Sequence, residues 1–231
     1  VAAGLLDPHF YTNRQKPMGI AYGWYLRRLQ QTVDDAYQAS NGQRVLICAH
    51  SAGGWLARAA LADDAWLASG GAGRVCGLVT LGAPHYPPPD GLAPCATRGA
   101  LAYCEQALPG AHVDGIEYVT VAGAAIAGAK PTVGEAAEQT AAQRAAAIAY
   151  NNYRALSGDG CAVGDGVIPV ETAHLPGAMQ LTLENVVHSI NEAGSAAPTE
   201  RWYGSERVID AWLPQVLECV GTSAARSSSD R

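Results

Sequence analysis

The sequence predicts an α/β fold with a doubly wound, mostly parallel sheet. Short apolar runs without polar alternation, such as 44–49 and 74–81, are typical of parallel strands that are buried on both faces. Amphipathic helical stretches alternate with these runs, and this order places helices on both faces of such a sheet. The length of 231 residues fits one domain of this kind.

Each expected element follows from apolar spacing and from the positions of glycine and proline. Residues 1–19 predict a loop because Pro8, Pro17 and Gly19 interrupt any regular pattern. Residues 24–39 predict an amphipathic helix. Its apolar residues, spaced for one helical face, are Trp24, Leu26, Leu29, Val33 and Ala36.

The alternation continues from the Asn41-Gly42 break to residue 220. Continuous apolar runs predict the first three strands, alternation predicts the fourth, and the apolar spacing of the last helix directs one face to the core. In chain order we expect a strand over 44–49, a helix over 52–68, a strand over 74–81, a short helix over 97–107, a strand over 116–122, a helix over 133–156, a strand over 179–183 and a helix over 207–220. The core-facing residues expected in that last helix are Val208, Ala211, Trp212, Val216 and Leu217.

Charge and composition limit the classes of partner. The 21 acidic and 15 basic residues give a net charge of −6, and the arginines are scattered along the sequence, so we expect no nucleic-acid partner. No apolar run approaches the roughly 20 residues of a spanning helix, although peripheral contact with a lipid surface stays open. The first residue is Val1 rather than methionine, so we interpret the chain as a piece of a longer protein.

The six cysteines show no zinc-ligand spacing, and we expect no metal and no cofactor. Cys48 and Cys76 fall in expected strands, which indicates small buried residues. A bridge between two of Cys95, Cys104 and Cys161 is left open.

The most informative local feature is a serine at the junction of an expected strand and helix. Ser51 follows the apolar run 45–50, and small residues, Ala49 and Gly53, lie two positions before and after it. This pattern indicates a nucleophile elbow, in which the strand and the helix nearly touch. The alternative is that Ser51 only caps the helix that begins at Ala52.

A serine nucleophile needs a histidine base and a carboxylate that orients the histidine. Asp165, on a tight loop flanked by glycines, is the candidate acid, and His188, just after the fourth strand, is the candidate base. Their order along the chain, serine, acid, histidine, is that of the α/β-hydrolases. The second choices are His174 for the base and Asp159 or Glu184 for the acid.

The other histidines have different expected places. His50 and His85 are both expected at the pocket, His50 packing or hydrogen-bonding near the elbow rather than acting as the base. His9 and His112 are expected at the surface.

Several segments resemble the lipase-like α/β-hydrolases of plant and algal plastids, which are similar to inositol-deacylating lipases. The resemblance implies a Ser51, Asp165 and His188 triad, hydrolysis of an acyl-lipid ester and a chloroplast location. The segments that carry it are Ala2 to Pro8, His50 to Arg58, Thr80 to His85 with the following prolines, Gly164 to Pro169, Ala173 to Leu175, Val187 to Ser189 and Trp202 to Ser205.

The oxyanion of the expected reaction needs two backbone donors. The amide of Ala52 is one, but residues 1–44 contain no early strand with the loop that normally gives the second. We therefore expect an N-terminally incomplete hydrolase domain over 1–220, with possible cap or lid segments at 84–112 and 125–160, and a disordered polar tail over 221–231. The alternatives are a non-catalytic hydrolase-fold subunit that docks into a larger assembly, and a thioesterase or peptidase on the same scaffold.

Overall fold

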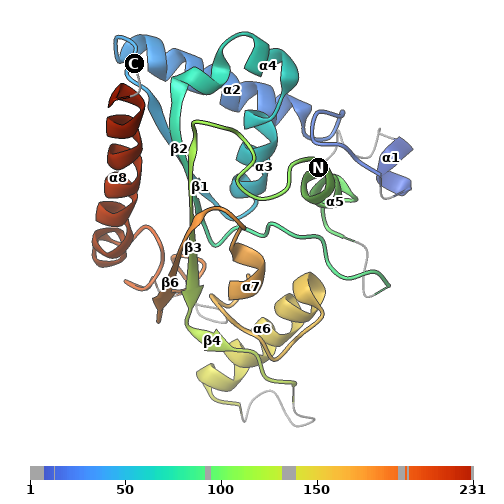
Figure 1. Ribbon diagram of the computed structural model, residues 1–231. Helices are drawn as coiled ribbons and strands as arrows, with labels where there is room; N and C mark the ends of the chain where they lie inside the picture. The colour runs from blue at the N-terminus through green and yellow to red at the C-terminus, as the bar shows by residue number, and fades with distance from the viewer. Residues whose placement is uncertain are drawn as a thin grey trace.

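The protein is built around a four-stranded sheet, seen in a computed structural model (Figure 1). The structure describes residues 8–12, 14–91, 95–131, 139–191, 196 and 198–229, with Phe10 and 222–229 described by their backbone only. The strand order is β1-β2-β3-β6, and every pair in this sheet is parallel. These strands are β1 (Val45–His50), β2 (Val75–Leu81), β3 (Glu117–Ala124) and β6 (Met179–Glu184).

Helices cover both faces of this sheet, as the sequence predicted. Helices α2 (Gly23–Ala39) and α3 (Ala52–Leu61) pack on one face, and α8 (Glu206–Ser229) packs on the other (Figure 1). The remaining elements are α1 (Pro8–Tyr11), α4 (Asp64–Ala68), a 3-10 turn (Gly71–Arg74), α5 (Ala100–Ala107), α6 (Ala141–Ser157), α7 (Val170–Ala173) and a small antiparallel pair, β4 (Ile126–Ala127) with β5 (Val163–Gly164).

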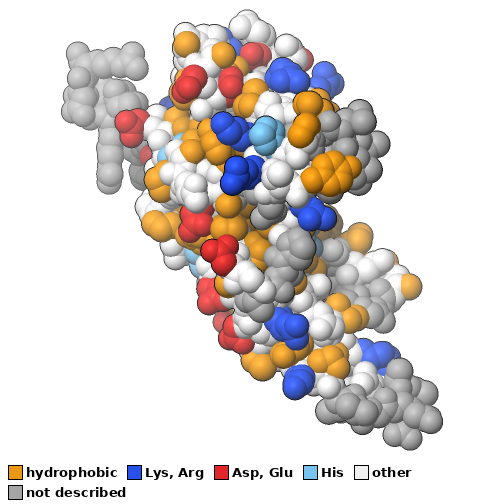
Figure 2. All heavy atoms as spheres, turned by 90° about the vertical axis from the view of Figure 1, so that its right-hand side faces the viewer, with side chains coloured by type: hydrophobic (Ala, Val, Ile, Leu, Met, Phe, Trp, Pro, Cys, Tyr) orange, Lys and Arg blue, Asp and Glu red, His pale blue; other side chains and the backbone are white. Residues whose placement is uncertain are grey.

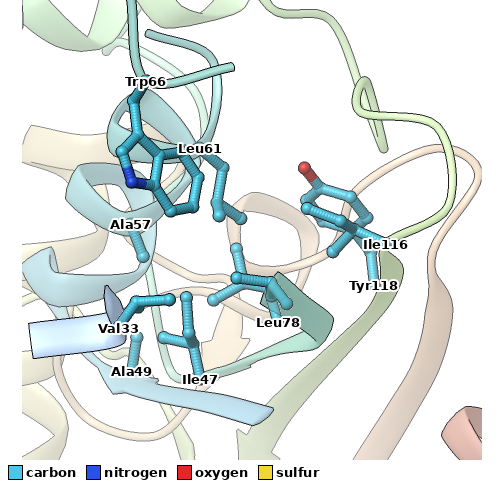
Figure 3. Packing of buried hydrophobic residues seen from close by; sticks show 10 residues of the cluster. Val33, Ile47, Ala49, Ala57, Leu61, Trp66, Leu78, Ile116 and Tyr118 are labelled. Atoms are coloured by element: carbon cyan, nitrogen blue, oxygen red, sulfur yellow. The ribbon is translucent and has the colours of Figure 1, made fainter. Parts of the chain in front are cut away.

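Apolar side chains fill the space between each helical layer and the sheet. Figure 3 shows Val33 of α2 and Ala57 and Leu61 of α3 packed against Ile47 and Leu78 of the sheet. On the opposite face, a second core joins the sheet to α8. It includes Val79, Leu81, Val119 and Val121 from the strands and Val208, Trp212 and Val216 from the helix. The two layers hold the carboxyl ends of the parallel strands together at one edge.

The predicted helix over 52–68 is wrong in one respect, because the structure divides it into α3 and α4. Asp63 lies between them and accepts a hydrogen bond at its carboxylate from the amide of Trp66, at 3.0 Å. An aspartate in this position caps a new helix start. The predicted helix over 133–156 corresponds to α6, and residues 133–138 lie outside the described residues.

Four residues predicted to be buried in these elements are exposed. Cys48 is exposed because β1 is the edge strand of the described sheet and α8 packs over β2, β3 and β6. Trp24 in α2 and Leu217 in α8 are 58% and 54% exposed, since the buried stripe of each helix is narrower than the sequence pattern. Ala211 is exposed for the same reason.

Two further expectations need correction. Cys76 is only half-buried, and all six cysteines are free, so the open possibility of a disulfide is not realised. The predicted tail over 221–231 is helical to Ser229, because α8 simply continues and extending a formed helix costs less than starting one. In the part of the chain that the structure describes, none of the helices has the length and apolarity needed to cross a membrane.

Candidate active site

Ser51 occupies a strained junction between β1 and α3. Its backbone dihedrals are φ 55° and ψ −132°, a region that non-glycine residues rarely adopt, and such strain costs about 1–3 kcal/mol. Its amide donates to the carbonyl of Leu81 on β2, at 2.9 Å, which ties the turn to the sheet. The Ser51 hydroxyl makes no capping bond to α3, so the helix-cap interpretation is wrong.

The three residues predicted from the sequence form one chain of hydrogen bonds. The Ser51 hydroxyl lies 3.0 Å from Nε2 of His188, and Nδ1 of His188 lies 2.8 Å from Oδ2 of Asp165. Asp165 and His188 are 2% and 7% exposed, so this chain is shielded from water up to the serine. In this arrangement the hydroxyl donates to Nε2, and Nδ1–H donates to the carboxylate.

The Asp165 loop holds its own carboxylate in place. Oδ1 accepts hydrogen bonds from the amides of Val167 and Ile168, at 2.9 and 2.7 Å. The carbonyl of Asp165 accepts from the amide of His188, at 2.9 Å, so the loop is also joined to the histidine through the backbone. Amide donors of this kind stabilise the charged carboxylate.

Tyr203 completes the surroundings of the acid, and the sequence did not single it out as a functional residue. Its hydroxyl donates to Oδ2 of Asp165, at 2.9 Å, and accepts from the amide of Gly123, at 2.7 Å. Burial, and then the nearby Asp165 charge, raise the pKa of Tyr203 well above 10, so the phenol stays a donor. Only the Trp202-Tyr203-Gly204-Ser205 segment of the resemblance pointed toward it.

Gly82 leaves room for this cluster. A Cβ atom at Gly82 would lie 2.5 Å from Oδ2 of Asp165 and 2.8 Å from the Tyr203 ring, and its φ is 51°. Any side chain there would displace the acid.

Helix α6 supports the acid loop from outside. The hydroxyl of Tyr153 accepts from the amide of Gly166, at 2.7 Å, and donates to the carbonyl of Ile126, at 3.0 Å. The side-chain amide of Asn152 donates to the carbonyl of Gly166, at 2.9 Å. This part of the predicted 125–160 cap segment therefore supports the loop that carries Asp165. A role of the segment as a lid stays a prediction.

His50 lies against the base and not in its place, as predicted. Its Nε2–H donates to the carbonyl of His188, at 2.9 Å, and the centroids of the two rings are 4.6 Å apart. Burial, and then the neighbouring His188, lower the pKa of His50. His50 is therefore neutral near pH 7 and adds no charge beside His188.

The other candidate side chains lie away from the serine. His85 is fully buried, with Nε2 3.1 Å from the Thr80 hydroxyl, so the prediction that it lines an open pocket is wrong. His174 contacts the hydroxyls of Thr120 and Thr182, at 2.9 and 3.0 Å, and so is not the base.

The second-choice acids do not take part in the hydrogen-bonded chain. Asp159 accepts from the amide of Cys161, at 2.8 Å, and Glu184 is exposed at the end of β6. His9 is exposed as predicted. His112 is half-buried, with Nδ1 3.3 Å from the carbonyl of Gly110, and is therefore not the surface residue that the sequence suggested.

The close approach between helix and sheet falls one residue later than predicted. A Cβ atom at Gly54 would lie 2.4 Å from Cβ of Ala83, whereas one at Gly53 would lie 3.8 Å from Cβ of Ala49. The first distance is a severe overlap and the second is ordinary contact. Gly54 is therefore the residue that allows α3 to approach β2.

The predicted oxyanion donor, Ala52, lies at the start of α3, and its role stays a prediction. Ala52 is the first residue of the helix, so its amide points out of the helix end, where the dipole favours negative charge. The expectation of a second donor from an earlier loop stays a prediction. Within the described ranges, His, Cys, Asp and Glu form no group of three or more that could hold a metal ion.

The carboxyl ends of β1 and β6 thus bring a serine and a histidine together across a parallel sheet that is covered by helices on both faces. The fold is that of an α/β-hydrolase. Neither the protein-family models nor the curated proteins give a match to this chain.

Among solved structures, the chain is similar to the mature form of the Bacillus licheniformis lipase BlEst2 and to its propeptide form. The sequence identity is 20% for both, and the TM-scores are 0.46 and 0.44. The matches cover 69% of this chain and only 64% and 35% of the lipase chains. At these TM-scores the likeness carries no argument about this chain, so the function has to be inferred from the site. The plastid subfamily stays a prediction.

Proposed function

We propose that the protein is a serine carboxylester hydrolase that acts on an acyl lipid. Ser51 is the nucleophile, His188 the general base and then the general acid, and Asp165 the carboxylate that orients the histidine. The hydrogen-bonded chain from Ser51 through His188 to Asp165 carries this proposal. The strained backbone of Ser51 supports it, because such strain persists where a function requires it.

The geometry suits acyl transfer in two steps. The Ser51 oxygen attacks the ester carbonyl carbon while its proton passes to Nε2 of His188, and the amide of Ala52 donates to the oxyanion. The intermediate collapses to an acyl-enzyme, and His188 gives its proton to the departing alcohol. Water then loses a proton to His188, attacks the acyl carbon and releases the acid, and the proton returns to Ser51.

Asp165 and Tyr203 act through the histidine. The Asp165 carboxylate fixes the tautomer that leaves Nε2 free to accept a proton, and it stabilises the imidazolium that forms. The Tyr203 hydroxyl holds the carboxylate oxygen that faces His188. We regard Tyr203 and His50 as positioning residues, since their side chains hydrogen-bond to Asp165 and His188 and not to the Ser51 hydroxyl.

Labelling by a fluorophosphonate probe tests the proposal. We expect the wild-type chain to be labelled at Ser51 and to hydrolyse p-nitrophenyl esters. Comparison of kcat/KM for esters from acetate to palmitate shows which acyl length the site prefers. S51A is expected to lose labelling and to lower kcat by at least about 10⁴-fold. S40A removes a hydroxyl that bonds only to the backbone at the end of α2, and should keep both properties.

The outcome also separates the alternatives. A folded wild-type chain that is neither labelled nor active would contradict the enzyme assignment and support the non-catalytic subunit of a larger assembly. Faster turnover of a thioester or a peptide amide than of the matched ester would support the thioesterase or the peptidase instead. The chloroplast location is a separate expectation, to be tested by imaging a tagged full-length protein.

A further inference from the structure

We propose that the exposed residues between Arg14 and Arg28 form a docking surface for anionic lipid, placed beside Ser51. We call this surface the basic aromatic face. Its apolar members include Ile20, Trp24 and Tyr25, and its basic members include Arg14, Arg27 and Arg28. The binding does not depend on the chemistry of Ser51, and only its role in delivering a substrate rests on the proposed function.

Large apolar side chains on this face are open to solvent. Ile20 and Trp24 are each 58% exposed, and Met18 and Tyr25 are 38% and 37% exposed. The indole N–H of Trp24 donates to the carbonyl of Ala21, at 3.0 Å, so no polar atom prevents the ring from entering an apolar layer. Aromatic side chains with a satisfied polar end are those that gather at membrane interfaces.

Basic side chains surround these apolar groups. Arg14, Lys16, Arg27 and Arg28 are all exposed, and residues 8–33 contain no Asp or Glu, although the whole chain carries a net charge of −6. Figure 2 shows Lys and Arg side chains beside hydrophobic ones on the side of the molecule that carries α1 in Figure 1. Positive charge is therefore concentrated in this segment, although the chain as a whole is acidic.

Helix α2 presents the apolar and basic groups together. Trp24, Arg27 and Arg28 are spaced i, i+3 and i+4, so they share its solvent face. Lys16 and Met18 instead border a hollow that Asp63 and Asp64 also line. Because those carboxylates oppose the Lys16 charge, the three arginines are expected to supply most of the attraction to lipid.

The basic aromatic face adjoins the nucleophile. The hydroxyl of Tyr25 lies 3.9 Å from the position of a Cβ atom on Gly53, two residues after Ser51. Helix α2 is also firmly attached to α3, because Leu26 packs against Trp55 and the Tyr22 and Trp55 rings meet edge to face with centroids 5.1 Å apart. A lipid surface bound here would lie next to the site.

Anionic lipid is the occupant that this chemistry favours. An acidic protein is repelled from an anionic bilayer unless a local basic region faces it, and each basic residue near the surface strengthens binding by about fivefold. Binding through this face should weaken strongly with salt, since exposed charges are screened over about 10 Å at 0.1 M.

Vesicle cosedimentation with the full chain tests the proposal. We expect binding to phosphatidylglycerol-containing vesicles at low salt, little binding to pure phosphatidylcholine vesicles, and loss of binding at about 0.5 M NaCl. R27Q/R28Q should lower the partition coefficient by about 25-fold. The matched control R144Q/R154Q removes the same charge from exposed positions on α6 and should change it by less than about twofold.

Three results would overturn the docking surface. The first is that the wild-type chain does not bind anionic vesicles, and the second is that it binds anionic and phosphatidylcholine vesicles equally. The third is that R27Q/R28Q and R144Q/R154Q weaken vesicle binding to the same extent. Hydrolysis of soluble p-nitrophenyl acetate separates this proposal from the enzymatic one, because R27Q/R28Q should leave it unchanged. Anionic vesicle binding without any ester hydrolysis would reject the proposed function and keep the docking surface.

Discussion

Replacing Gly54 with alanine should damage both stability and activity, whereas the same change at Gly53 should not. The two glycines are neighbours in the first turn of α3 and differ in what a new methyl group would meet. At Gly54 it would lie 2.4 Å from Cβ of Ala83 and 3.1 Å from Cγ2 of Thr80. At Gly53 the nearest atoms are 3.8 and 3.9 Å away, on Ala49 and Tyr25.

The magnitude follows from these distances. Non-bonded carbon atoms pack at about 3.5–4.0 Å, so G54A requires α3 and β2 to separate by about 1 Å. The Ala83 methyl cannot rotate away, which places the overpacking cost near the upper limit of about 3 kcal/mol. Alanine recovers about 1 kcal/mol of helix propensity, so we expect a net loss of about 2 kcal/mol, or about 4–8 °C in Tm. G53A should be neutral or stabilised by up to about 1 kcal/mol.

Urea unfolding followed by circular dichroism measures the free energy, and ester hydrolysis measures the effect on the site. A shift of about 1 Å in α3 moves Ser51 and the Ala52 amide relative to His188, and a misplacement of this size can cost about 100-fold in kcat. G53A should keep wild-type kcat. If G54A were as stable and as active as G53A, the argument that Gly54 sets the distance between helix and sheet would be wrong.

Two further predictions concern Tyr203 and His85. Y203F removes the donor to Asp165 and leaves the Gly123 amide unpaired, so it should lower the free energy of unfolding by about 2–3 kcal/mol. It should also move the acidic limb of the pH profile of kcat/KM to higher pH. Y103F is the control, and an unmoved limb would reduce Tyr203 to a packing role. Burial lowers the pKa of His85 well below 6.5, so below that pH the unfolded chain binds a proton that the folded chain excludes, and stability falls as the pH falls. Between about pH 8 and pH 5.5, His85 should account for about 1.4 kcal/mol of the decrease in the free energy of unfolding. Urea unfolding of H85Q should therefore show a decrease that is smaller by this amount. An equal decrease in H85Q and the wild type would mean that another group governs the pH dependence.

The sequence predicted the sheet well because each strand carries a local signal. The runs that contain Val45–His50 and Val75–Leu81 are apolar over most of their length, which is the pattern of strands in a covered parallel sheet. β2 is buried on both faces, whereas β1 buries mainly the face that carries Ile47 and Ala49. The residues of the hydrogen-bonded chain were also predictable. Ser51, Asp165 and His188 each lie in a short distinctive segment, and their chain order agrees with the fold.

Residues that act through distant contacts could not be found in this way. Tyr203 reaches Asp165 across 38 residues, and Tyr153 supports the acid loop from a helix whose own pattern is only amphipathic. The exposure of Trp24 and Cys48 was missed for a related reason. An apolar residue is buried only if another element covers it, and the sequence does not state which strand lies at an edge.

One signal was available and overlooked. Asp63, followed by Asp64, stands within the predicted helix over 52–68, and an aspartate there is a typical helix start. The distinction between Gly53 and Gly54, in contrast, depends on Ala83, which lies just after β2 in another segment of the chain. No pattern within the elbow itself carries that information.

The support of Asp165 also bears on how the chain folds. His188 and Tyr203 hydrogen-bond to Asp165 itself, whereas Tyr153 bonds to its neighbour Gly166 and Gly123 to Tyr203. These four residues come from four segments, and the Ser51 to His188 contact closes a separation of 137 residues. Contacts between such distant segments form late, because long loops must close before they contribute. Ser51 follows β1 and His188 follows β6, so their contact requires both strands to be in the sheet. During refolding the proposed esterase activity should therefore return only after most of the secondary structure has formed.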